Sequence, residues 1–368
     1  MKNLNIVMLG GSGAGKTVYL ASLYNKLSIQ GNEDHNLFYL DLENWEDKNK
    51  LQNIFASVAA PTVNWPDGTR TVKNWQFQCC VKTQCVRTQK KQIYEIFSFN
   101  YIDYAGGMIS NILDDEQSQG QRQQLEQEIK EASVILGLLD GEKIVKFMNG
   151  HPSAAKWINI DLVSILQVMN NSLCPIHFVI SKWDYVEAMG FSLKQIKNKL
   201  LIIEQFRNLV EASRDRIRLI PVSSVGNGFA SFEKTDDGSF RMIKTGQIFV
   251  KPYQVELPLA YVMIDVIQNA SEKLAKKMEE MNFISKILFQ LKSIFINSLT
   301  EFMPPETQWM ANKVLIKTVK NSSILYKDSL EHVQNKKAAL DHLANCFMSI
   351  IERSEGSRTT ILIKRKKR

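Results

Sequence analysis

The sequence predicts an α/β fold, with helices flanking a mostly parallel sheet, followed by a C-terminal all-α helical region. Short apolar runs alternate with amphipathic segments across the first 225 residues, which is typical of strand–helix–strand units. The runs at 4–9, 133–139 and 176–180 are almost wholly apolar, as expected of strands covered on both faces. From residue 258 the spacing of apolar residues becomes helical.

The elements are expected in a regular order along the chain. We expect strands at 4–9, 72–81, 93–103, 133–139, 176–180 and 217–222, and helices at 16–27, 41–55, 110–131, 161–169 and 193–212. This pattern divides the chain into a first domain at 1–225, an inserted hairpin or linker at 226–252, and a helical region with a basic tail at 253–368.

The composition fits a protein with an ordinary hydrophobic core. The chain has 368 residues, of which 44% are hydrophobic and 23% are charged. Its five cysteines form no C-x-x-C pair, and an odd number argues against a disulfide framework, so we expect a cytoplasmic protein. No apolar run reaches the ~18 residues that a membrane span needs. We also expect no signal peptide.

The loop after the first strand carries the strongest motif. Gly10-Gly11-Ser12-Gly13-Ala14-Gly15-Lys16-Thr17 matches G-x-x-x-x-G-K-[ST] without a mismatch, and chance gives such a match with odds on the order of one in a hundred. Glycines allow the backbone amides to turn toward phosphates. The groups expected to surround the phosphates belong to Gly13, Ala14, Gly15, Lys16, Thr17 and Val18. The Lys16 ammonium would reach the β- and γ-phosphates and the Thr17 hydroxyl would bind Mg²⁺, which predicts a P-loop NTPase fold.

A second motif, D-x-x-G, ends the strand at 93–103. The Asp103 carboxylate can hold a Mg²⁺-bound water, and the Gly106 N–H can reach the γ-phosphate. Taken alone, a turn aspartate followed by a turn glycine is the blander reading. Its place between the phosphate loop and the later strands strengthens the functional interpretation.

Two further polar segments follow the next strands. In Ser181-Lys182-Trp183-Asp184, the Asp184 carboxylate can accept hydrogen bonds from guanine N1–H and N2–H₂, a donor pair that adenine lacks, while the Lys182 stem lies along the base. After the strand at 217–222, Ser223 and Ser224 can hold the guanine O6. All four motifs follow strands, at the edge where ligands bind in open α/β sheets.

With these motifs in this order, residues 1–225 resemble a Ras-like GTPase of the translation-factor-related class. The resemblance implies GTP or GDP with Mg²⁺ as cofactors, with Lys16 and Gly106 in catalysis and Thr17 and Asp103 at the metal. It also implies a second Mg²⁺-contacting threonine. We favour Thr69, which follows a Pro-Asp-Gly turn, over Thr71 and Thr62. The insert and the helical extension resemble bacterial GTPases of multi-protein systems.

Two positions depart from that family. Ser181 stands where Asn or Thr is usual, which predicts a weaker tie between the base loop and the phosphate loop. Gly107 stands where many members have the Gln that orients water, so hydrolysis should be slow unless a Gln at 117–124 or a partner's Arg substitutes. The sequence therefore supports a slow GTPase switch that signals through its C-terminal helices. Alternatives are a GTP-dependent scaffold with negligible hydrolysis and, less favoured, an ATPase.

The remaining features suggest partners rather than chemistry. The helical stripe at 284–302 suits a core or a protein interface, with membrane contact expected about one time in five. The net charge of +8 is concentrated in the C-terminal region. The basic residues 364–368 suit contact with nucleic acid or with anionic lipid, and lipid contact would place the protein at a membrane periphery. They suit a solvated tail equally well. The five histidines show no ligand spacing, so we expect them to be surface or core residues.

Overall fold

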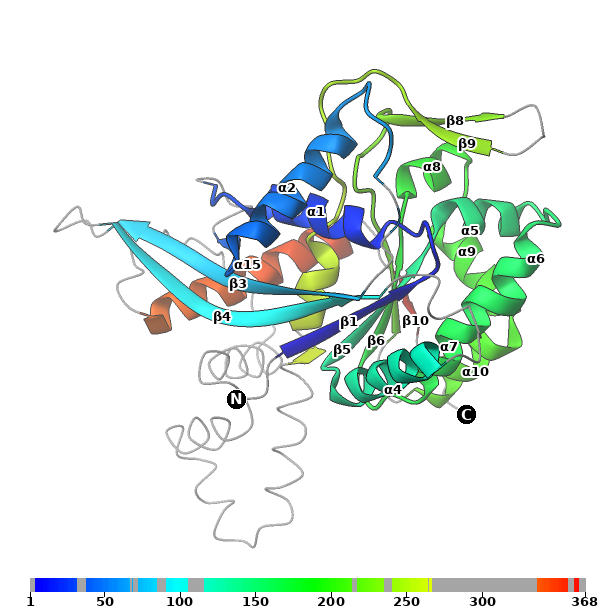
Figure 1. Cartoon of the computed structure of the whole chain (residues 1–368), viewed down its shortest axis with the longest axis horizontal. Helices are drawn as coiled ribbons and strands as arrows, with labels where there is room; N and C mark the ends of the chain where they lie inside the picture. Colours follow the sequence, from blue (N-terminus) through cyan, green and yellow to red (C-terminus); the bar gives the residue numbers. More distant parts are fainter. Residues whose placement is uncertain are drawn as a thin grey trace, which may run out of the picture.

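The fold is described by a computed structural model. The described residues are 4–31, 38–66, 68, 72–84, 91–104, 116–213, 217–234, 240–263, 265–266, 336–356 and 361–363. Within them a central sheet carries helices on both faces (Figure 1). None of the described helices is long and apolar enough to cross a membrane.

The central sheet has eight strands in the order β10-β7-β6-β5-β1-β4-β3-β2. Their bounds are β1 Leu4–Gly10, β2 Tyr39–Leu42, β3 Lys73–Gln84, β4 Lys91–Asp103, β5 Val134–Leu139, β6 Ile176–Ile180, β7 Ile217–Pro221 and β10 Ile361–Ile363. The five middle strands, from β7 to β4, are mutually parallel. β10, β3 and β2 run antiparallel to their neighbours. The predicted α/β class with a mostly parallel sheet is confirmed.

The helices form two layers. Their bounds are α1 Lys16–Leu27, α2 Trp45–Ala59, α4 Glu116–Glu131, α5 Gly141–Met148, α6 Ala154–Lys156, a π-helical turn at Trp157–Leu162, α7 Val163–Asn170, α8 Trp183–Ala188, α9 Leu193–Leu200, α10 Glu204–Ala212 and α15 Lys336–Gly356. Helix α1, residues 257–263 and α15 pack on one face of the sheet, and the helices from α4 to α10 pack on the other. Alternate residues of β1 point to the two faces, as a pleated strand requires.

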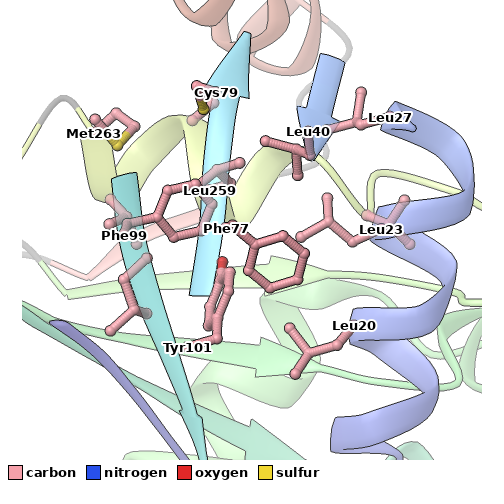
Figure 2. Close-up of a cluster of buried hydrophobic side chains, with 14 of the residues drawn as sticks. Leu20, Leu23, Leu27, Leu40, Phe77, Cys79, Phe99, Tyr101, Leu259 and Met263 are labelled. Atoms are coloured by element: carbon pink, nitrogen blue, oxygen red, sulfur yellow. The ribbon is translucent and has the colours of Figure 1, made fainter. Parts of the chain in front are cut away.

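Aromatic residues fill the core between α1 and the long β3–β4 pair. Phe77 and Phe99 stack with ring centroids 5.4 Å apart, and Tyr101 meets both rings edge-on. Figure 2 shows leucines of α1 facing these rings, with Leu259 and Met263 behind them. Burying so much aromatic and aliphatic surface fixes α1 on the sheet, and with it the loop that precedes α1.

Two predicted helices are wrong in part. The helix expected at 41–55 begins only at Trp45, because Tyr39–Leu42 pairs with β3 and the Asn44 side chain caps α2 by accepting from Glu46 N at 2.8 Å. The helix expected at 193–212 is broken into α9 and α10. Apolar residues on both pieces reach the same core, so the helical period continues across the break and hides it.

The C-terminal part of the chain returns to the sheet. Helix α15 packs in the same core as α1, and β10 pairs antiparallel with β7. β10 thus adds a strand to a region for which helices were predicted. The division at 225 and 252 stays a prediction, and these contacts join the described end of the chain to the first 225 residues. The stripe at 284–302 and the tail at 364–368 lie outside the described residues.

Candidate nucleotide-binding site

The predicted site residues converge at one edge of the sheet. The parallel strands β1, β4, β5, β6 and β7 all end there, at Gly10, Asp103, Leu139, Ile180 and Pro221. In the sequence, the four motifs begin at or shortly after the ends of four of these strands. Parallel strands place their carboxyl ends together, so segments more than 200 residues apart in sequence become neighbours.

The loop Gly10–Thr17 encloses the Lys16 ammonium. Gly13 and Gly15 have φ of 77° and 82°, values that side chains resist. Lys16 Nζ donates to Gly10 O at 2.8 Å and to Gly11 O at 3.3 Å, and the residue is 6% exposed. Burial lowers the pKa of Lys16, and the nearby Asp103 charge opposes that shift. A bound polyphosphate would supply the negative charge that this buried cation lacks.

Thr17 and Asp103 place two side-chain oxygens together beside the loop. Thr17 Oγ1 donates to Asp103 Oδ2 at 2.7 Å across 86 residues of sequence. Asp103 is fully buried, and its Oδ1 has no hydrogen-bond partner among the described residues. Burial raises the pKa of Asp103, with Lys16 and Thr17 acting against that rise. A buried carboxylate beside a hydroxyl fits Mg²⁺, which binds through few protein oxygens and completes its shell with phosphates and water.

The two base-loop motifs are directly connected. Asp184 Oδ1 accepts from Ser223 Oγ at 2.6 Å, and Ser223 Oγ accepts from the Gly226 N–H at 2.8 Å. Burial raises the pKa of Asp184, and the Ser223 hydroxyl partly offsets this. Lys182 has φ of 51°, so the turn between β6 and α8 is tight. Backbone hydrogen bonds from Asp184 and Tyr185 also hold this carboxylate, so Ser223 is one of several groups that fix its orientation.

Sequence reasoning missed Asp140, which also belongs to this edge. Lys182 Nζ lies 2.8 Å from Asp140 Oδ1, and Asp140 caps α5 by accepting from Glu142 N at 3.0 Å. A Cβ atom on Gly141 would lie only 2.4 Å from Ser181 O, so glycine is required where this loop meets the base loop. The signal was available, because Asp140 follows a buried strand as the four predicted motifs do.

The other base-loop serines make structural contacts. Ser181 Oγ donates to Leu139 O at 3.3 Å, which ties the base loop to β5. Ser224 O accepts from Ser22 Oγ of α1 at 2.8 Å. The base side is therefore anchored to both the neighbouring strand and the helix that follows the phosphate loop.

Some predicted residues cannot be placed. Thr69, Thr71, Gly106 and Gly107 lie outside the described residues. Thr62 is described and exposed. Gly68 lies beside the phosphate loop, since a Cβ atom there would be 3.9 Å from Ser12 Oγ. Among the residues with described positions, no three His, Cys, Asp or Glu side chains gather as a metal cluster.

The architecture is that of the P-loop NTPase fold. The strand, glycine-rich loop and helix of the phosphate site occur in the required order, at the carboxyl edge of a parallel sheet. Neither a protein-family sequence model nor a curated protein sequence matches the chain.

Several solved structures are distantly similar. The signal recognition particle receptor SRb-GTP/SRX complex from Chaetomium thermophilum aligns at 12% identity with a TM-score of 0.34, covering 62% of this chain and 94% of that one. The S. cerevisiae Ski7 GTPase-like domain, bound to GDP and inorganic phosphate, aligns at 16% identity with a TM-score of 0.35, covering 60% of this chain and 43% of that one. The G domain of the T. maritima FeoB iron transporter aligns at 14% identity with a TM-score of 0.28, covering 61% of this chain and 91% of that one. The chain thus spans less than half of the Ski7 chain.

Proposed function

We propose that this chain binds GTP and GDP with Mg²⁺ and hydrolyses GTP slowly. One observation carries the proposal: the Thr17 hydroxyl donates to the buried Asp103 carboxylate, whose other oxygen has no hydrogen-bond partner among the described residues, beside the enclosed Lys16 ammonium. Such an arrangement of opposite charges, each incompletely neutralised by protein, suits Mg²⁺ and polyphosphate together. When bound, Mg²⁺ would be held by Thr17, with the Asp103 carboxylate reaching it directly or through water.

The preference for guanine rests on Asp184. Its carboxylate is fixed by Ser223, and Ser223 is fixed by the Gly226 amide, so the acceptor is oriented before a base arrives. An oriented carboxylate suits the paired N–H donors of guanine. Adenine has no such pair, and its approach would leave a buried charge unpaired. An ATPase would require Asp184 to turn away from the base, against this relay.

The proposed role is that of a molecular switch. GTP and Mg²⁺ would order the segments around Thr69 and Gly106, and hydrolysis would release them. The C-terminal helices would pass the change to a protein partner. The basic residues 364–368 would contact either nucleic acid or anionic lipid. Contact with lipid would keep a cytoplasmic protein at a membrane periphery.

A scaffold is the second candidate, and Gly107 favours it. Where a Gln would orient the attacking water, Gly107 has no side chain to do so. A protein that retains GTP without hydrolysing it would act through assembly with its partner. The two candidates share the same binding site and differ only in the rate of phosphate release.

Nucleotide retention and phosphate release separate these readings. Purified protein is incubated with radiolabelled GTP or ATP and Mg²⁺, alongside Lys16→Ala, Asp184→Asn and the control Lys130→Ala, which replaces an exposed lysine at the end of α4. We expect retention of GTP by the wild type and the control, loss with Lys16→Ala, and selective loss of GTP with Asp184→Asn. Slow phosphate release would support the switch, and none would support the scaffold.

Two results would contradict the proposal. Equal retention of ATP and GTP, unchanged by Asp184→Asn, would remove the guanine assignment. Unchanged affinity for both nucleotides in Lys16→Ala would remove the phosphate site altogether.

A further inference from the structure

The hairpin β8 (Ala230–Lys234) and β9 (Phe240–Lys244) follows the base loop and lies beside α8 and the end of α2 (Figure 1). It contacts the segment that leads toward Thr69. Trp65 Nε1 donates to Met242 O at 3.0 Å. Lys244 Nζ donates to Ser57 O at 2.6 Å and to Ala60 O at 2.8 Å.

The Lys244 ammonium caps α2 from outside the helix. The last carbonyls of a helix lack partners within it and carry partial negative charge, so a cation there is favourable. Lys244 Nζ also lies 4.9 Å from the centre of the Trp65 ring. One side chain of the hairpin thus fixes both the end of α2 and the first residues after it.

An apolar cluster strengthens the same contact. Val58, Val225 and Phe229 are buried together, and Val18 and Trp65 pack against them. The Trp65 and Phe229 rings meet edge-on at 6.5 Å. The cluster therefore joins α1, the end of α2, the base loop and the hairpin in one contact.

The other end of the hairpin is fixed to the base side. The Phe232 ring of β8 stacks on Tyr185 of α8, with centroids 3.6 Å apart. Tyr185 follows Asp184 directly. At its root, the Gly226 amide holds Ser223, which holds Asp184. The hairpin thus bridges the residues assigned to the base and the segment 60–68, of which the structure describes residues 60–66 and Gly68. Gly68 approaches Ser12 of the phosphate loop.

We propose that Lys244 and Trp65 are positioning residues that hold the segment 60–68 against the phosphate loop, so that the hairpin couples the base loop to the γ-phosphate side of the site. The proposal rests on the proposed function, since it names which nucleotide state the hairpin favours. In the proposed function, Thr69, which follows this segment directly, would meet the Mg²⁺ and γ-phosphate of GTP, and GDP has no γ-phosphate to offer. The hairpin contacts should therefore strengthen GTP binding more than GDP binding.

The test compares GTP and GDP affinity in hairpin variants. Lys244→Met keeps the length of the side chain and removes its donors, and Trp65→Phe keeps an aromatic ring and removes its N–H. Lys251→Met is the matched control, because Lys251 is an exposed lysine of the same insert. Dissociation constants for a non-hydrolysable GTP analogue and for GDP are measured across a Mg²⁺ titration. Thermal unfolding is followed in parallel.

We expect Lys244→Met and Trp65→Phe each to raise the dissociation constant of the GTP analogue at least about fivefold, while that of GDP changes less than about twofold. The loss should shift the Mg²⁺ requirement upward, and Lys244→Arg should restore it because its guanidinium can donate to the same carbonyls. Because the two residues contact one another, the double variant should lose less than the product of the single losses.

The outcomes keep the two proposals apart. Equal losses for GTP and GDP, or none for either, would overturn the coupling while leaving guanine nucleotide binding intact. Failure of the wild type to bind any nucleotide would instead remove the proposed function, and the coupling with it.

Discussion

The strands β6 and β7 have buried charged residues near both ends, and the protein compensates the charges at the two ends to different degrees. At their carboxyl ends lie the base-loop residues Asp184 and Ser223. At their amino ends His177 and Arg218 are register partners, and Asp265 joins both from the segment that follows residues 257–263. Asp265 Oδ2 lies 2.6 Å from His177 Nε2 and 2.6 Å from an Arg218 nitrogen. We call His177, Arg218 and Asp265 the amino-end cluster.

The pKa directions separate the two ends. Burial alone would raise the pKa of Asp265, but His177 and Arg218 outweigh it and the pKa is lowered. Burial dominates at Asp103 and Asp184, and their pKa values are raised. A carboxylate whose charge the protein already compensates serves the fold. Buried carboxylates left under-compensated at a ligand edge indicate that something else completes them.

The largest expected effect comes from breaking the amino-end cluster. Asp265→Asn should lower the free energy of unfolding by about 3–5 kcal/mol, because it leaves the Arg218 charge buried without its counter-ion. Guanine nucleotide affinity per folded molecule should stay unchanged. Urea denaturation and nucleotide binding measure the two quantities, with Asp161→Asn on the helical layer as the control. A loss below about 1 kcal/mol would show that the cluster is not a structural ion pair.

A second prediction concerns the backbone of the base loop. Gly226 has φ of 82°, and a Cβ atom there would lie 2.0 Å from Lys251 O. Gly226→Ala should therefore cost about 2–3 kcal/mol in the free energy of unfolding and displace the amide that holds Ser223. The matched control is Gly246→Ala, which has φ of 87° but open space around the new Cβ. If the two variants lose the same free energy of unfolding, backbone strain alone explains the loss and the close approach to Lys251 contributes nothing.

The third prediction is a pair of opposite pH dependences. The raised pKa values of Asp103 and Asp184 mean that the folded, nucleotide-free protein binds more protons than the unfolded chain, so these groups make it more stable as pH falls toward their pKa. Asp265 acts oppositely. Its stabilisation is complete above the ordinary carboxyl pKa of 3.8 and is lost as pH falls through its lowered value.

The pH dependence of nucleotide binding should reflect the raised pKa of Asp184, because Asp184 must be ionised to accept hydrogen bonds from guanine. GTP affinity should therefore begin to fall at a higher pH than an ordinary aspartate would dictate. Titrating affinity from about pH 7.5 downward, in the wild type and in Asp184→Asn, measures this. A wild-type profile that begins to fall no higher than the ordinary carboxyl pKa of 3.8 dictates would contradict the raised pKa.

The sequence foretold the carboxyl edge far better than the amino edge. Lys16, Asp103, Asp184 and Ser223 stand at strand ends in a recognisable order, and parallel strands must bring such ends together. Nothing local marks the amino-end cluster. The expectation that His177 is a surface or core residue is confirmed as core, but its partner Arg218 is 41 residues away and Arg218 meets Asp265 across 47 more. Only the packing of residues 257–263 on the sheet creates those contacts.

The hairpin contacts were unpredictable for a related reason. Lys244 donates to Ala60, the residue that follows α2, across 184 residues of sequence, and no sequence spacing predicts such a contact. The break between α9 and α10 escaped notice because both pieces bury the same face. Sequence patterns report burial and strand ends. They do not report which surface segments meet.

The smallest expected effect lies within the base relay itself. Ser223→Ala removes the hydroxyl that donates to Asp184 and leaves the carboxylate with its backbone hydrogen bonds from Asp184 and Tyr185. A lost hydrogen bond to a charged group costs about 1.5 kcal/mol, so GTP affinity should fall about tenfold, with ATP affinity unchanged. Ser223→Thr keeps a hydroxyl and should retain most of the affinity if the added methyl fits. The measurement is competition of GTP and ATP for the same protein. An equal loss for both nucleotides would mean that Ser223 supports the sheet edge as a whole, and that the carboxyl end of β7 resembles its amino end more closely than the pKa directions indicate.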